Sequence, residues 1–212
     1  MSENKIHIQN LFPTPLMRVE SFLSDAEISP LVAQVKKHNK TRNSRSNKLS
    51  HSLPIRAQEN PLFANISDKA APYLRDFGFL LFGENLEWTV KEMWTNVLSH
   101  QGHQTLHSHA NSFISGVLYL SDSHDSAKTV FHKSMGGQEF VFSNTHADSQ
   151  ITPYNADRWV AKEASKGDLL LYPSHLLHAV PANLGQERIS LALNALPNRL
   201  KSWDYEVKFS HD

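Results

Sequence analysis

The chain has 212 residues, of which 40% are hydrophobic and 20% are charged, and its formal net charge is zero. This composition is typical of a single globular domain, and the balanced charge gives no general attraction to nucleic acid or to an anionic membrane. The absence of cysteine excludes disulfide scaffolds, thiol nucleophiles and cysteine-bound metals. The N-terminus has no apolar h-region and no apolar run approaches the roughly 20 residues that span a bilayer, so we expect a cytoplasmic protein without a membrane segment.

The first third of the chain is expected to supply helices. Residues 10–19 contain two prolines and are expected to be extended. The Ser-Asp-Ala-Glu sequence at 24–27 is typical of a capping box and predicts a helix that ends near residue 37. The Asn-Pro pair at 60–61 suits an N-cap and a first helical turn, so a second helix is predicted there.

Between these helices, residues 36–48 carry six Lys or Arg side chains and no acid. The segment is either a solvated loop or a lid that meets an anionic substrate. It contains no aromatic residue that could stack on bases, so nucleic-acid binding is not expected.

From residue 87 onward the pattern changes to short apolar strands separated by Gly, Ser, Asn and Asp. Strands in this order without intervening helices indicate a sandwich or small barrel with the helices packed on one side. The closing residues 203–209 are expected to add an edge strand. We expect one domain over residues 1–212, with helical support from 20–80 and a β core from 87–196. The predicted core strands are 88–98, 112–121, 128–134, 138–143, 158–164, 167–174, 178–182 and 187–196.

Histidine is frequent, with 13 residues, and one His-x-His pair occurs at His107 and His109. Two residues at i and i+2 of an extended backbone point to the same face, so both imidazoles can bind one metal ion. At this density about one such pair is expected by chance, so further residues must support the site. His178 follows a buried-looking strand close to the turn and is the preferred third ligand, with His175 as a rival.

The strand at 187–196 alternates apolar residues with Arg188, Ser190, Ala192 and Asn194. Its polar face either lies in water or lines the interior of a barrel. In the second case Arg188 would bind a carboxylate through its forked donors, with Ser190 adding a hydroxyl. Taken with the histidines, this order suggests a mononuclear metal site beside an anchor for an acidic co-substrate.

Several spaced motifs together resemble the 2-oxoglutarate- and iron(II)-dependent oxygenases. The resemblance is strong from residue 94 to residue 194 and looser before that. The matching motifs are Trp94-Thr95-Asn96, Gly102, His107-Ser108-His109, the Ser-Gly-Val-Leu-Tyr-Leu run at 115–120, Gly167-Asp168, Pro173-Ser174, His178, Arg188-Ile189-Ser190 and Asn194.

The resemblance implies a double-stranded β-helix, the jelly-roll barrel of these enzymes, with iron(II) held by His107, His109 and His178. It implies no catalytic residue beyond these ligands. The usual ligand set is two His and one carboxylate, whereas position 109 is His. Either three imidazoles bind the metal, or a carboxylate comes from elsewhere, or water completes the shell. Without a carboxylate, zinc or copper also suits the ligand types.

The resemblance also implies that Arg188 binds the distal carboxylate of 2-oxoglutarate with help from Ser190. Further co-substrate contacts are implied for Asn96, Tyr119 and Asn194. The implied reaction consumes O2, converts 2-oxoglutarate to succinate and CO2, and hydroxylates a small-molecule or peptide substrate. Residues 121–158 are then a barrel-rim insertion, either a surface loop or a frame for that substrate.

Two other functions are open at this point. Three His around an open position is the arrangement with which a zinc hydrolase or hydratase activates water, although it gives Arg188 no role. A jelly-roll module that binds a sugar or an anion without catalysis is the other. The sequence leaves a homo-oligomer open.

Overall fold

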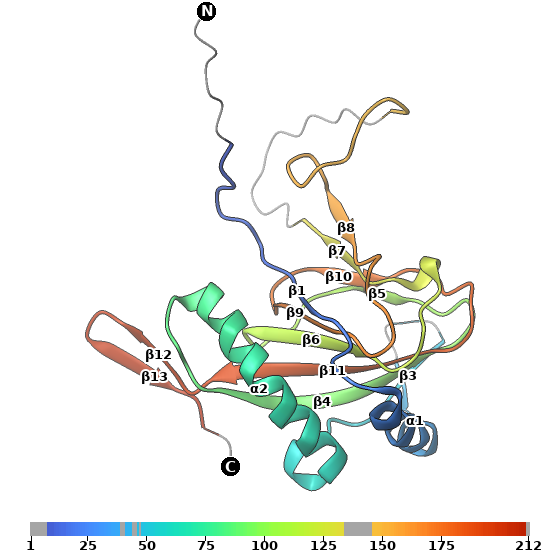
Figure 1. The fold of residues 1–212 in the computed structure, drawn as a ribbon, viewed down its shortest axis with the longest axis horizontal. Coiled ribbons are helices and arrows are strands. Elements are labelled where there is room, and N and C mark those ends of the chain that lie inside the picture. Colours follow the sequence, from blue (N-terminus) through green and yellow to red (C-terminus); the bar gives the residue numbers. More distant parts are fainter. Residues whose placement is uncertain (1–7, 39–40, 44–45, 47, 134–145, 211–212) are drawn as a thin grey trace, which may run out of the picture.

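The computed structural model describes residues 8–38, 41–43, 46, 48–133 and 146–210. Two α-helices, α1 (Asp25–His38) and α2 (Pro61–Phe82), precede most of the strands (Figure 1). The predicted strand at 138–143 and parts of the basic segment 36–48 lie outside the described residues. The strands are β1 (Met17–Val19), β2 (Thr41–Arg42), β3 (Leu49–His51), β4 (Trp88–Leu98), β5 (Gln104–His107), β6 (Ile114–Tyr119), β7 (Val130–His132), β8 (Arg158–Val160), β9 (Leu169–Pro173), β10 (His178–Val180), β11 (Arg188–Pro197), β12 (Arg199–Ser202) and β13 (Tyr205–Lys208).

Two antiparallel sheets form the body of the molecule. The larger has the order β1-β9-β6-β11-β4-β3-β2 and the smaller has the order β5-β10-β7-β8. Neighbours in these sheets are distant in the sequence, as when β11 pairs with both β4 and β6. This is the crossed connectivity of a jelly roll, so the predicted mainly-β fold with N-terminal helices is confirmed.

Both helix starts are set by local hydrogen bonds that the sequence predicted. At α1, the backbone N–H and the hydroxyl of Ser24 both donate to Glu27 Oε2, at 2.8 and 2.7 Å. At α2, the N–H of Leu62 donates to Asn60 Oδ1 at 2.9 Å. These contacts satisfy donors that have no partner within the first helical turn.

The larger sheet separates two packed layers. Its outer face packs against α1 and α2, and Figure 1 shows α2 crossing that face with α1 beside the ends of its strands. Its inner face packs against the smaller sheet through a second cluster that includes Tyr119, Phe131 and Tyr172. In β9, Leu169 and Leu171 belong to the first layer whereas Leu170 and Tyr172 belong to the second. A strand buried on both faces reads as a continuous apolar run, which is why its alternation is hidden in the sequence.

The Gly167-Asp168 motif forms a structural corner at the start of β9. Gly167 has φ of +90°, and a Cβ there would lie 2.6 Å from the carbonyl oxygen of Leu23. Asp168 is buried and accepts hydrogen bonds from Arg18 Nε and from the N–H groups of Ser21 and Ser165, all at 2.9 Å. The motif therefore ties β1 and the following loop to the larger sheet.

The C-terminal segment forms a strand as predicted, but that strand does not join either of the two main sheets. Residues 205–208 do not extend the core; they form β13, which pairs with β12 in a separate two-stranded sheet. Figure 1 shows this hairpin projecting from the body of the molecule. Its residues are largely exposed. No helix in the described part of the chain combines the length and the apolar character of a membrane span.

Candidate metal and co-substrate site

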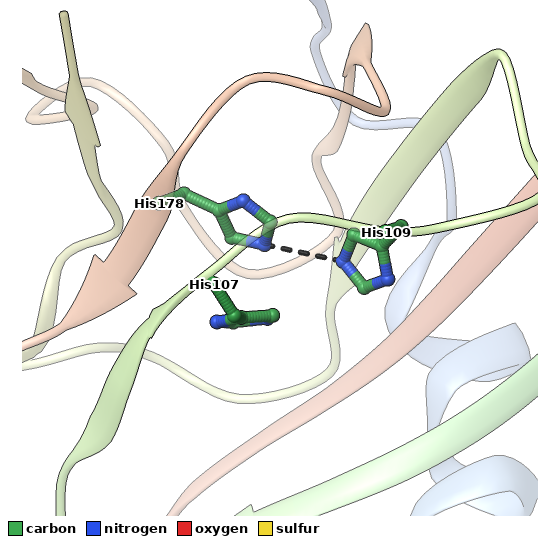
Figure 2. A group of neighbouring side chains, drawn as sticks. All are labelled: His107, His109 and His178. Carbon is green, nitrogen blue, oxygen red and sulfur yellow. Dashed lines mark hydrogen bonds between the residues drawn. The ribbon is translucent and has the colours of Figure 1, made fainter. Parts of the chain in front are cut away.

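Three imidazoles converge at one end of the smaller sheet (Figure 2). His107 ends β5, His109 follows it, and His178 begins β10. One ring nitrogen from each residue lies within 4.8 Å of the other two. The Nε2 atoms of His109 and His178 are 3.2 Å apart, and the ring centroids of His107 and His178 are 4.2 Å apart. The three rings surround a point that one cation can occupy.

Strand pairing brings the rings together. His178 is the register partner of His107 in the β10–β5 pair. His109 lies beyond the end of β5, where its N–H donates to the carbonyl oxygen of Ser174 at 2.9 Å. Its ring packs against Trp94 with centroids 5.4 Å apart. The rival ligand His175 is exposed and is not part of the cluster.

Backbone carbonyls orient two of the rings. His107 Nδ1 is 2.8 Å from the carbonyl oxygen of Thr105, and His178 Nδ1 is 2.9 Å from that of Leu176. Since a carbonyl oxygen only accepts, both Nδ1 atoms carry the proton and both Nε2 atoms keep a lone pair. Such contacts fix the tautomer and direction of a metal-binding histidine.

The imidazoles are neutral at neutral pH. Burial is the largest cause that lowers the pKa of His109 to about 4 and that of His178 to about 3, and the neighbouring imidazoles lower both further. Burial likewise lowers the pKa of His107. Because a metal binds only the unprotonated nitrogen, the cluster can accept a cation without first losing protons.

A buried guanidinium lies in the same cavity. The Arg188 residue is 3% exposed, and its terminal nitrogens donate to Ser190 Oγ at 3.2 Å and to Thr129 Oγ1 at 3.3 Å. It also lies 5.0 Å from the centre of the Tyr119 ring. Its Nε has no hydrogen-bond partner. Among the described residues no carboxylate lies within 4.0 Å of it.

An unpaired buried cation is costly, and an anionic ligand would remove that cost. The polar face of β11 therefore lies in the barrel interior rather than in water. One cavity joins this guanidinium to the three imidazoles. It is lined by Trp94, Asn96, Gln104, His107, His109, Val117, Thr129, Tyr172, His178, Val180, Arg188, Ser190 and Ala192.

The residues expected to contact a co-substrate are placed in two groups. Asn96 and Ser190 line the cavity, and they are register partners on β4 and β11. Tyr119 does not line it; the ring lies behind Arg188, and its hydroxyl is 2.8 Å from Thr129 Oγ1. Asn194 also lies outside the lining, because its side chain is bonded to Glu92 and Ser115.

Three polar lining residues, Gln104, Thr129 and Tyr172, were not anticipated from the sequence. Thr129 and Tyr172 are brought in by packing between the sheets, and the Tyr172 hydroxyl is 3.2 Å from His178 Nε2. Gln104 Nε2 is 3.2 Å from His107 Nε2, although residues three apart on a regular strand face opposite ways. The register of β5 against β10 shifts between His178 and Val180, which brings both side chains to one face. No signal in the sequence marked Tyr172, because β9 is buried on both faces and reads as a continuous apolar run.

Comparison with known proteins agrees with this geometry. Residues 92–194 match a family model described as "Putative 2OG-Fe(II) oxygenase". That segment contains all three imidazoles and the buried arginine. This middle part of the chain is therefore similar to the 2-oxoglutarate- and iron(II)-dependent oxygenases. No curated protein matches the chain.

Solved structures share the fold at low sequence identity. HygX from Streptomyces hygroscopicus, solved with nickel and 2-oxoglutarate bound, has a TM-score of 0.64 at 14% identity over 87% of this chain and 83% of its own. The epimerase SnoN from nogalamycin biosynthesis is described as non-heme and alpha-ketoglutarate-dependent. It has a TM-score of 0.62 at 11% identity over 88% of this chain and 80% of its own. A Pseudomonas putida prolyl-4-hydroxylase has a TM-score of 0.59 at 15% identity over 85% of this chain and 92% of its own.

Proposed function

We propose that the cavity is the active site of an iron(II)- and 2-oxoglutarate-dependent oxygenase, with His107, His109 and His178 as metal ligands and Arg188 as the co-substrate anchor. One observation carries this assignment: a metal-binding cluster without a carboxylate and an unpaired buried guanidinium share one cavity. A zinc hydrolase would use the cluster but would leave Arg188 without a ligand.

The donor set fits the proposed groups. Three neutral imidazoles leave the full charge of a divalent cation uncompensated, and dianionic 2-oxoglutarate would neutralise it. When bound, the iron and 2-oxoglutarate supply the oxidising chemistry: O2 and the co-substrate yield succinate and CO2 while one oxygen atom passes to the substrate. We therefore propose that His109 binds the metal in place of the usual carboxylate, so that three imidazoles form the ligand set.

The protein's own residues bind, orient and exclude water. Arg188 provides forked donors for the distal carboxylate, and the Ser190 and Thr129 hydroxyls hold the fork in place. Asn96 offers an amide to the same end of the cavity. Fixing the far end of the co-substrate limits the positions of its chelating end, which is a proximity contribution.

The proposed substrate is a small molecule or a peptide that carries an unactivated C–H bond. HygX has been solved with hygromycin B bound and SnoN with nogalamycin RO, so the fold accommodates both. The single-domain organisation, the cytoplasmic location and the role of the basic segment 36–48 stay predictions.

The test is an anaerobic titration of the metal-free protein with iron(II) and then with 2-oxoglutarate. We expect one iron per chain, followed by the visible charge-transfer band of a chelated 2-oxo acid. Admission of air should then yield succinate. A wild-type protein that binds iron but neither binds nor consumes 2-oxoglutarate would overturn the proposal.

A further inference from the structure

The three-imidazole cluster contains no negative charge, yet a carboxylate lies beside it on the inner face of β4. Glu92 is two residues before Trp94 and four before Asn96, and both of these side chains line the cavity. Alternation along a strand places all three on the same face. The Trp94 ring in turn packs against His109. Glu92 therefore stands on the His109 side of the metal cluster.

A chain of hydrogen bonds holds this carboxylate. Asn194 Nδ2 donates to Glu92 Oε1 at 2.9 Å, and Asn194 Oδ1 accepts from the Ser115 hydroxyl at 2.7 Å. The Ser115 hydroxyl is also 2.8 Å from that of Ser174. Glu92, Asn194 and Ser115 are register partners across β4, β11 and β6, so the chain crosses three strands of the larger sheet. Asn194 and both serines are almost fully buried, which makes the geometry rigid.

Residues of this hydrogen-bonded network also hold the segment 109–111, at both of its ends. The N–H of His109 donates to the carbonyl oxygen of Ser174. Two residues later, the carbonyl oxygen of Asn111 accepts from Lys91 Nζ at 3.2 Å, and Lys91 Nζ is 3.1 Å from Glu92 Oε1. His109 lies beyond β5 and has no strand partner of its own, so these contacts take the place of a sheet ladder.

The electrostatics of Glu92 and His109 also link these two residues. Burial acts to raise the pKa of Glu92, but the hydrogen bond from Asn194 and the nearby Lys91 outweigh it, and the pKa is lowered. The carboxylate is thus ionised at neutral pH. The negative charge of Glu92 acts to raise the pKa of His109, whereas burial lowers the pKa of that imidazole.

We propose that Glu92, held by Asn194, is a positioning residue that orients His109 and supplies the negative charge the three-imidazole set lacks. The inference rests on the proposed function. With a metal held through His109 Nε2, the nitrogen that faces His178, the proton of the neutral imidazole would lie on Nδ1 and would need an acceptor. A carboxylate is the usual acceptor behind a metal-bound histidine.

The test is a titration of the metal-free protein with cobalt(II), followed through the visible d–d spectrum. Glu92→Gln keeps the size of the side chain and can still accept from Asn194, so it removes the charge alone. We expect its dissociation constant for cobalt(II) to rise roughly 10- to 100-fold with a shifted spectrum. Glu92→Asp, which keeps the charge, should recover part of that affinity. Asn194→Ala should weaken binding in the same direction.

Glu87→Gln is the matched control, because Glu87 is an exposed carboxylate just before β4. It should bind cobalt(II) as wild type does. A Glu92→Gln variant within twofold of wild type, with an unchanged spectrum, would overturn the inference while leaving the proposed function intact. If wild type itself binds no cobalt(II), the proposed metal site fails as well. Should Asn194→Ala not fold, the Glu92 variants decide the question alone.

Discussion

Replacing Arg188 with methionine should change ligand binding and stability in opposite directions. The substitution keeps an unbranched buried side chain but removes the charge and the forked donors. A hydrogen bond to a charged group contributes about 1.5–3 kcal/mol. Loss of the one or two bonds available to the distal carboxylate of 2-oxoglutarate should therefore cost about 2–4 kcal/mol. At about 1.4 kcal/mol per tenfold, that is a rise of roughly 30- to 700-fold in Kd.

The stability of the ligand-free protein should not fall. The guanidinium is buried, its Nε has no partner, and its two bonds to hydroxyls are long, at 3.2 and 3.3 Å. Exchange of a buried charge for an apolar group of similar volume is commonly neutral or stabilising. For Arg188→Met we expect a free energy of unfolding that is unchanged or raised by up to about 2 kcal/mol, less than the full gain because Ser190 and Thr129 each lose a donor.

Two measurements check this prediction. Anaerobic titration of the iron(II)-loaded protein with 2-oxoglutarate gives the Kd, and urea unfolding of the metal-free protein gives the free energy. Arg188→Lys is the informative companion, since it keeps the charge without the fork and should bind 2-oxoglutarate with intermediate affinity. If Arg188→Met instead unfolded more easily by over 1 kcal/mol and bound 2-oxoglutarate normally, the guanidinium would be a structural brace and the site assignment would be wrong.

Three further predictions follow from the geometry. His178→Ala should reduce bound iron(II) from one per chain to near zero in equilibrium dialysis, whereas the exposed His175→Ala should not. The metal-free protein should lose stability as the pH falls from about 6.5 toward 4, because unfolded imidazoles protonate near 6.5 while burial holds the pKa of His109 at about 4; the unfolded state then binds more protons. Urea unfolding at pH 7 and pH 5 measures this, and His109→Ala should reduce the difference without abolishing it, because burial also lowers the pKa of His178. Asp168→Ala should lower the unfolding free energy by about 2–4 kcal/mol, because Arg18 Nε and the N–H groups of Ser21 and Ser165 lose their acceptor, without changing the Kd for 2-oxoglutarate. A loss of affinity at unchanged stability would place Asp168 in the binding site instead.

Much of the fold could be predicted because its signals are local. The helix starts at Ser24 and Asn60 depend on side chains that bond to the backbone two or three residues away, and both occur as predicted. The strand at 88–98 was predicted with its observed bounds. A strand was predicted within residues 203–209 and one forms there, but its pairing with β12 could not be predicted, because β propensity does not say which partner a strand will have.

By itself the sequence determined the residue types, the order of the elements and the candidate ligands His107, His109, His178 and Arg188. It could not decide whether the polar face of β11 met water or the barrel interior, since alternation is the same in both cases. Only the tertiary structure decided that, because burial depends on the second sheet folding over the first. The same holds for Thr129 and Tyr172, which line the cavity, and for Glu92, whose position beside Asn194 depends on strand register.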